Sequence, residues 1–190
     1  LEETLAAKGK DEALHLVKDM LHNPGSVFYV RQQQPAGLGH AVWCARHLVG
    51  SEPVAVLLAD DLILGASCVK EMVDAYKGGN MVAVMDVPHE QTGSYGIVTP
   101  GADDGRIVQV EGLVEKPDPS SAPSNIAVVG RYIITPEVFE TLAAQERGAG
   151  GEIQLTDALA KQIGKAPFSG VRFSGERYDL SLIHISEPTR

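Results

Sequence analysis

Apolar runs alternate with helical patterns along the first half of the chain. Consecutive apolar residues at 26–30 (SVFYV), 53–59 (PVAVLLA) and 80–87 (NMVAVMDV) predict buried strands. Helical spacing at 39–49 (GHAVWCARHLV) and 67–77 (SCVKEMVDAYK) predicts the helices between them. Because the strand runs are continuous rather than alternating, we expect a mostly parallel sheet covered on both faces, as in layered α/β domains.

Strand candidates become more closely spaced after residue 88. The runs at 95–100 (YGIVTP), 105–117 (GRIVQVEGLVEKP) and 125–136 (NIAVVGRYIITP) are separated by Gly, Asp, Pro and Ser. This spacing predicts a meander or a small subdomain laid over the sheet, with loops placed to cover a ligand.

The remaining elements lie toward the two ends of the chain. Helices are expected at 136–144 and at about 153–163, and FSGVRFSG at 168–175 supplies a last strand. Near the N-terminus, an apolar helical stripe runs from Leu14 to Leu21.

The acidic balance of the chain narrows its possible partners. The 190 residues include 16 Lys and Arg against 25 Asp and Glu, a net charge of −9, without a dense basic run. Nucleic-acid-binding proteins usually present a basic face, so we expect no nucleic-acid partner. The content of 44% hydrophobic and 22% charged residues is typical of one soluble globular domain.

The two cysteines indicate a reducing compartment. Cys44 and Cys68 lie in apolar contexts without CxxC or Cys/His metal spacing. They predict reduced core thiols and a cytoplasmic location. No stretch approaches the roughly 18 apolar residues of a membrane span, so no membrane partner is expected.

The last residues differ in character from the rest. After GERYD, residues 180–190 (LSLIHISEPTR) match the translation of a common transposon-end sequencing adapter. We therefore expect residues 180–190 to be a non-native tail, and His184 is not considered a catalytic histidine. A genuine tail with a short strand is the alternative.

The stretch QQQPAGLGHAVW at 32–43 places Gly37 and Gly39 directly before a predicted helix. It matches neither G-x-G-x-x-G nor G-x-x-x-x-G-K-[ST] and holds no Lys, so it is weak as a phosphate loop. A simple turn is the alternative. The amides of residues 32–34 can donate and accept hydrogen bonds, which suits recognition of a nucleobase edge.

Two further stretches carry charges at predicted strand ends. Asp60 and Asp61 follow a buried strand, where carboxylates can bind a divalent metal together with substrate phosphates. Glu115 and Lys116 precede a Pro, where the carboxylate could accept sugar hydroxyls and the ammonium could meet a phosphate. An exposed acidic turn and a surface ion pair are the respective alternatives.

The stretch GAGGEIQLTDAL at 148–159 predicts a glycine-rich turn followed by a helix. Glu152 or Thr156 could cap this helix locally, which would be a structural role.

The order of these stretches resembles one family, the bacterial UTP–glucose-1-phosphate uridylyltransferases or UDP-glucose pyrophosphorylases. The resemblance covers residues 1–179 and rests on VRQQQPAGLGHAVWCARHLVG, EPVAVLLADDLI, SYGIV, VEGLVEKP, APSNIAVVGRYIITPEVF and GAGGEIQLTDAL. It implies a partial nucleotidyltransferase domain of Rossmann-like, GT-A-like fold, with a mixed, mostly parallel sheet and helices on both faces. It also implies conversion of UTP and glucose 1-phosphate to UDP-glucose and pyrophosphate with Mg²⁺, in a homo-oligomer.

The resemblance implies roles for individual residues. Asp60 and Lys116 are the expected catalytic residues. The other expected roles are nucleotide binding by Gln32, Gly37 and Gly39; sugar binding by Gly96, Glu115, Val129 and Gly130, within a glucose site that includes Asn125 to Gly130; and metal binding by Asp60 and Asp179, with Asp61 the less certain ligand.

The implied mechanism is in-line attack of the sugar phosphate on the α-phosphorus of UTP, without a covalent enzyme intermediate. It depends on positioning and charge neutralisation. The family's first strand, its G-x-G-T-R loop with a following Lys and its C-terminal helices do not occur in this chain. We therefore expect an internal fragment whose parent protein is active and which is itself inactive.

Three alternatives remain open at this point. Another sugar-1-phosphate nucleotidyltransferase, such as a thymidylyltransferase, differs by only a few contacts. A metal-dependent glycosyltransferase also places Asp pairs after a strand, although VEKP and GEIQLTDAL argue against it. A non-catalytic nucleotide-sugar binding module is the third possibility.

Overall fold

The computed structural model describes residues 1–180, so His184 and most of the expected tail lie outside the described residues. The chain forms two compact units, Leu1–Arg31 and the part that begins at Gln32. The first unit holds α1 (Glu2–Ala7) and α2 (Asp11–Asp19). The predicted apolar stripe is helical at Leu14 and Val17 but not at Leu21, and α2 buries none of its residues.

The predicted strand at residues 26–30 is wrong. This segment has no regular secondary structure, and both Phe28 and Tyr29 are exposed. Its β-branched and aromatic residues favour extended backbone, but a strand also needs a hydrogen-bonded neighbour. Within residues 1–180, no strand pairs with it.

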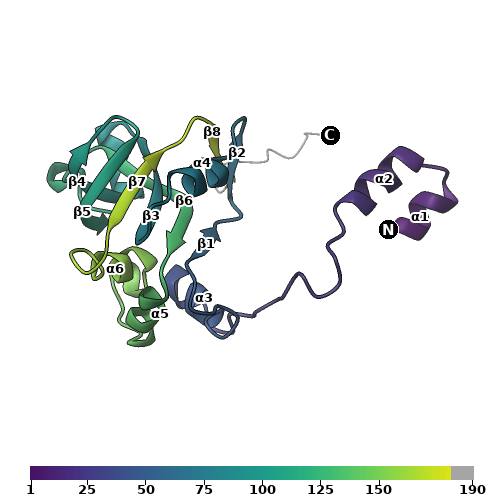
Figure 1. The fold of residues 1–190 in the computed structure, drawn as a ribbon, viewed down its shortest axis with the longest axis horizontal. Coiled ribbons are helices and arrows are strands. Elements are labelled where there is room, and N and C mark those ends of the chain that lie inside the picture. Colours follow the sequence, from purple (N-terminus) through teal and green to yellow (C-terminus); the bar gives the residue numbers. More distant parts are fainter. Residues whose placement is uncertain (181–190) are drawn as a thin grey trace, which may run out of the picture. The chain divides into compact units, whose positions relative to one another are not determined.

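The second unit is built on a six-stranded sheet of order β1-β6-β3-β7-β5-β4, with a further pairing of β6 with β4 (Figure 1). The strands are β1 (Val54–Leu57), β3 (Asn80–Asp86), β4 (Gly96–Asp103), β5 (Ile107–Glu115), β6 (Ile126–Ile134) and β7 (Phe168–Arg172). Ile97 lies opposite Ala127 where β4 meets β6.

The expected mostly parallel sheet is wrong. In the described part of the chain, β3 and β7 form the parallel pair of this sheet, and all its other pairs are antiparallel. Continuous apolar runs report burial on both faces, but they carry no information about strand direction. The short connection between β4 and β5 favours an antiparallel pair.

Of the meander or subdomain expected after residue 88, the antiparallel pair of β4 with β5 is present, but it is not laid over the sheet as a separate layer. β6 lies between β1 and β3, and β5 lies beside β7, so these strands belong to the main sheet. A small second sheet pairs β2 (Asp61–Leu64) with β8 (Glu176–Asp179) (Figure 1). The sequence does not predict either strand, because each has only four residues and pairs with a segment more than 100 residues away.

The four predicted helices of this unit are confirmed. They are α3 (Leu38–Cys44), α4 (Cys68–Ala75), α5 (Pro136–Ala143) and α6 (Leu155–Ala160), with short 3₁₀ turns at His89–Ser94, Pro119–Ser121 and Ala149–Gly151. The Ser67 hydroxyl accepts a hydrogen bond from the Lys70 amide at 3.3 Å and so caps α4. α3 and α6 are shorter than predicted because turns follow them.

Of the three apolar clusters in residues 1–180, the two larger ones join helices to the sheet. Val138 and Leu142 of α5 and Leu159 of α6 belong to the larger cluster. Cys68 and Met72 of α4 belong to the second cluster. Alternate residues of β6 contribute to the two clusters, so helices cover both faces of the sheet, as expected. Among residues 1–180, no helix combines the length and apolar character needed to cross a membrane.

Candidate functional site

A cavity of about 300 Å³ gathers charged residues from β2, β5, β8 and the loops between strands of the second unit. We call it the acidic cavity. Its charged lining residues are Asp60, Asp61, Glu115, Glu152, Asp179, Lys116 and Arg177. Most of the site residues expected from the sequence lie here, since Gly96 and Gly130 also line it.

The two neighbouring aspartates differ in environment. Asp61 is only 6% exposed, its Oδ1 accepts a hydrogen bond from Arg177 Nε at 2.5 Å, and its Oδ2 accepts one from the Gly130 amide at 2.7 Å. Asp60 is exposed, and within residues 1–180 its carboxylate has no hydrogen-bond or ion-pair partner. Asp60 is therefore the carboxylate available to a ligand.

Arg177 links several parts of the site and was not identified from the sequence. Its guanidinium also donates to Asp179 Oδ2 at 3.1 Å and to the Tyr95 hydroxyl at 3.4 Å. Burial opposes the charged form, but Asp61 and Tyr95 outweigh this effect and hold the pKa of Arg177 above its usual value. The sequence does hold one signal for Arg177. It lies two residues before Asp179, and residues i and i+2 of a strand point to the same face.

Glu115 and Lys116 lie at the end of β5 and face the cavity. The Glu115 side chain is 12% exposed and that of Lys116 is 55% exposed, with 4.0 Å between Nζ and Oε1. Lys116 has a φ of 46°, a left-handed conformation that is strained for a non-glycine residue. Its amide donates to the carbonyl of Tyr95 at 2.9 Å, which holds this conformation.

Gly96 leaves space beside the carboxylate of Glu115. A Cβ built on Gly96 would lie 3.2 Å from Glu115 Oε2 and 3.2 Å from Thr156 Cγ2. Both contacts are tighter than ordinary van der Waals contact, so any side chain here would displace one of these neighbours.

The turn at residues 36–39 packs against the segment before α6. The Ile153 amide donates to the Ala36 carbonyl, and the Gly39 amide donates to the Ile153 carbonyl, both at 2.8 Å. Leu38 lines the acidic cavity, whereas the lining does not include Gln32, Gly37 or Gly39. The structure therefore places this turn at the edge of the cavity.

The Gln32 side chain braces its own turn. Its Nε2 donates to the Gly37 carbonyl at 3.0 Å and lies 3.0 Å from His40 Nδ1. The expected caps are wrong, because α6 begins after Gln154 and receives no side-chain cap. Glu152 and Thr156 line the acidic cavity instead.

Val129 does not line the acidic cavity. Its side chain packs in the second apolar cluster with Met72, whereas Val128 lines the cavity. Alternation along β6 explains the difference, because neighbouring residues of a strand point to opposite faces. Of these two neighbouring valines, Val128 and not the expected Val129 therefore lines the acidic cavity.

The donor set of the acidic cavity fits a magnesium ion. Mg²⁺ prefers oxygen ligands and usually takes one or two carboxylates, with substrate phosphates and water completing its shell. Asp60 and Asp179 supply two carboxylates from adjoining strand ends, since the Leu180 amide donates to the Asp60 carbonyl at 2.8 Å. Within residues 1–180, no group of three or more His, Cys, Asp or Glu forms a protein-only metal site.

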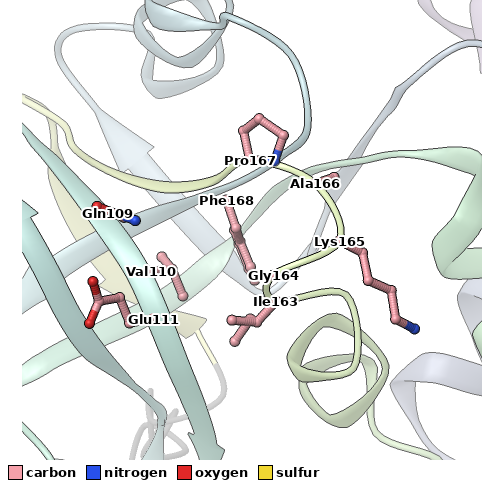
Figure 2. Close-up of a pocket in the computed structure, with 9 residues that line it drawn as sticks. All are labelled: Gln109, Val110, Glu111, Ile163, Gly164, Lys165, Ala166, Pro167 and Phe168. Carbon is pink, nitrogen blue, oxygen red and sulfur yellow. The ribbon is translucent and has the colours of Figure 1, made fainter.

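A larger pocket of about 510 Å³ lies elsewhere (Figure 2). Gln109 to Glu111 of β5 form one wall and Ile163 to Phe168 form the other. Figure 2 shows the Lys165 side chain directed away from the β5 wall. This pocket shares no lining residue with the acidic cavity and contains none of the site residues expected from the sequence.

Comparison with known proteins gives consistent matches. A family model described as nucleotidyl transferase matches residues 7–175. A UTP–glucose-1-phosphate uridylyltransferase of Komagataeibacter xylinus is 50% identical over 182 residues, which cover 94% of this chain and 64% of that protein. The chain therefore spans less than two thirds of the length of this relative.

Solved structures give the same result. A crystal structure of a UDP-glucose pyrophosphorylase complexed with UDP-glucose has a TM-score of 0.84 and 38% identity, covering 90% of this chain and 67% of that one. A UTP-bound UGPase from Acinetobacter baumannii has a TM-score of 0.81 and 35% identity, covering 94% and 64% respectively. These matches agree with the resemblance expected from the sequence.

Proposed function

Because the chain belongs to the nucleotidyl transferase family, we propose that the acidic cavity is part of the active site of a UTP–glucose-1-phosphate uridylyltransferase. The reaction is transfer of the uridylyl group of UTP to glucose 1-phosphate, which gives UDP-glucose and pyrophosphate. The observation that carries this proposal is the convergence of Asp60, Asp179, Glu115 and Lys116 on one cavity, at the edge of which lies the turn at residues 36–39.

The sugar would occupy the part of the cavity beside Gly96. Glu115 is a carboxylate of low exposure with two acceptor oxygens, so it can accept hydrogen bonds from two adjacent sugar hydroxyls. The missing side chain at Gly96 provides room for the ring, and Val128 and Gly130 contribute the neighbouring wall. This arrangement supports a sugar ligand rather than a simple ion.

The nucleobase would lie at the turn formed by residues 36–39. Gln32 already donates to the Gly37 carbonyl, which leaves its Oε1 as an acceptor for a base N–H. The role of Gly37 and Gly39 is to permit the close backbone approach to residues 152–154 that gives the turn its shape.

Asp60 and Asp179 would hold Mg²⁺, which when bound would neutralise phosphate charge and polarise the α-phosphate. Lys116 supplies a protein cation in the same cavity and can neutralise an oxygen of the sugar phosphate. Asp60 lacks a protein partner within residues 1–180, so its carboxylate does not have to break an ion pair before it binds. The residues of this chain therefore bind and orient the reactants, and none is required as a nucleophile.

Ligand binding tests the proposal without requiring turnover. Isothermal titration calorimetry with UDP-glucose, UDP and dTDP-glucose in the presence of Mg²⁺ should give the tightest binding for UDP-glucose. Equal affinity for UDP and UDP-glucose would exclude the sugar site, and tighter binding of dTDP-glucose would favour a thymidylyltransferase.

A further inference from the structure

The neighbouring carboxylates of Asp60 and Asp61 have different capacities to bind a cation. Both line the acidic cavity, but the two oxygens of Asp61 are already occupied by Arg177 and by the amide of Gly130. When a buried carboxylate has a partner on each oxygen, breaking those contacts to bind a metal costs free energy, because the partners are then left unpaired. Asp60 has no such contacts within residues 1–180.

β6 fixes both the side chain and the main chain of Asp61. A Cβ built on Gly130 would lie 2.2 Å from Asp61 Oδ2, so only glycine lets the carboxylate reach this amide. The next residue, Arg131, donates to the carbonyl of Leu58 at 2.9 Å and also to the carbonyl of Asp61. The turn that carries both aspartates is therefore held in one conformation.

Arg177 also links Asp61 of β2 to Asp179 of β8. Asp61 lies opposite Asp179 in the pairing of β2 with β8 (Figure 1), and the Arg177 guanidinium contacts both carboxylates. Without this cation, the carboxylates of Asp60, Asp61 and Asp179 would repel one another across the same cavity. The Arg177 side chain is only 11% exposed, so water compensates little for a lost partner.

We propose that Arg177 is a positioning residue that occupies Asp61 and thereby directs a metal ion to Asp60 rather than to Asp61. This inference rests on the proposed function, because it concerns the metal site of the same cavity. The planar guanidinium matches carboxylate geometry and keeps its charge at any pH at which the protein folds. Its role is to decide which of two adjacent aspartates the metal contacts.

A double-variant cycle tests the inference, with Mn²⁺ alone as the probe. Binding to the 190-residue chain is measured by electron paramagnetic resonance. In the wild-type background, Asp60→Asn should weaken Mn²⁺ binding at least about tenfold. In the Arg177→Gln background, Asp61 is free to replace Asp60, so the same substitution should weaken binding less than about threefold. Equal losses in the two backgrounds overturn the inference.

The matched control is Arg172→Gln. Arg172 also pairs with two aspartates, Asp86 and Asp103, but it does not line the acidic cavity. In this background, Asp60→Asn should have the same effect as in wild type. A reduced effect would mean that loss of any arginine paired with two aspartates changes the site, and the specific role of Arg177 would be wrong.

A second variant covers the case in which Arg177→Gln alone does not fold. Arg177→Gln combined with Asp61→Asn replaces the ion pair by neutral side chains of similar shape, which proteins often tolerate. In this pair, Mn²⁺ binding should again fall at least about tenfold on Asp60→Asn, because residue 61 is no longer a competing carboxylate. Loss of this dependence overturns the inference.

The outcomes also separate the inference from the proposed function. If Asp60→Asn has no effect in the wild-type background, the proposed metal site is wrong and the inference fails with it. If Asp60→Asn weakens binding equally in every background, the metal site stands and only the role of Arg177 is wrong.

Discussion

The amide of Gly39 donates a hydrogen bond to the carbonyl of Ile153 at 2.8 Å, which joins two segments far apart in the sequence. A Cβ on Gly39 would lie 2.8 Å from this carbonyl oxygen and 2.8 Å from Leu142 Cδ2. The second glycine of the turn is therefore required for backbone contact, and this contact positions the turn beside the acidic cavity.

The first prediction concerns this contact. Gly39→Ala should lower the free energy of unfolding by about 1–3 kcal/mol, since the methyl group must displace backbone or a core leucine. Urea unfolding measures the change. Gly50→Ala is the matched control, because Gly50 has open space around it and no left-handed backbone. If both variants lose the same stability, the contact with Ile153 is not what requires glycine.

The second prediction separates the adjacent aspartates by stability. Asp61→Asn should lower the free energy of unfolding by about 3–5 kcal/mol, because it leaves the buried Arg177 guanidinium without its main counter-charge. Asp60→Asn should change it by less than about 0.5 kcal/mol, as expected for an exposed residue whose carboxylate has no partner among residues 1–180. Chemical denaturation of both variants checks this, and equal losses would contradict the assigned environments.

The third prediction uses the left-handed backbone of Lys116. Lys116→Gly should be more stable than Lys116→Ala by about 1 kcal/mol, because alanine retains the strain at positive φ and glycine does not. At Lys70, inside α4, the order should reverse by about 1 kcal/mol, because glycine is a poor helix former. Thermal and urea unfolding of the four variants gives the comparison. If the alanine variant is the more stable one at both positions, the backbone of Lys116 is not strained.

The fourth prediction concerns the proposed sugar site. Glu115→Gln should weaken UDP-glucose binding by about 10- to 100-fold, since hydrogen bonds to a charged group contribute about 1.5–3 kcal/mol. Binding of UDP should be unchanged. Glu111→Gln is the control, because Glu111 is on the same strand but lines the other pocket (Figure 2). A similar loss in both variants, or a loss of UDP binding with Glu115→Gln, would argue against direct contact with the sugar.

The fifth prediction is a pH dependence. Burial raises the pKa of the Cys68 thiol to about 11 from its usual 9.0. The folded state therefore holds the neutral thiol where the unfolded chain ionises, so this stabilisation is full below pH 9 and is lost as the pH rises toward 11. Urea unfolding at pH 8 and pH 10.5 should show a smaller decline for Cys68→Ala than for wild type. Cys44→Ala serves as the control, and an identical decline in all three proteins would contradict the burial effect.

Local sequence pattern was sufficient for most elements of the second unit. The apolar run at residues 80–87 forms β3, and the helical spacing at 67–77 forms α4, because burial and propensity act within a few residues. The run at residues 26–30 has the same local character but forms no strand, since pairing is a property of two segments.

The sequence predicted most of the residues that line the candidate site, but it predicted less of the contacts that each residue makes there. The sequence identified Asp60, Glu115 and Lys116, and the structure places all three in one cavity. It could not separate Val128 from Val129, because the choice depends on which face of β6 is turned toward the cavity. The sequence does not indicate Arg177 as a site residue, because its partner Asp61 is 116 residues away.

The sequence by itself determined where most strands and helices of the second unit form and which residue types can carry chemistry, because hydrophobic periodicity and side-chain charge are local properties. Only the tertiary structure decided the antiparallel direction of most strands, the pairing of β2 with β8, and the division of Asp60 and Asp61 into an exposed carboxylate and a buried, paired one. The physical reason is that hydrogen-bond pairing and charge compensation depend on the neighbour that folding brings near, and the chain order does not state that neighbour.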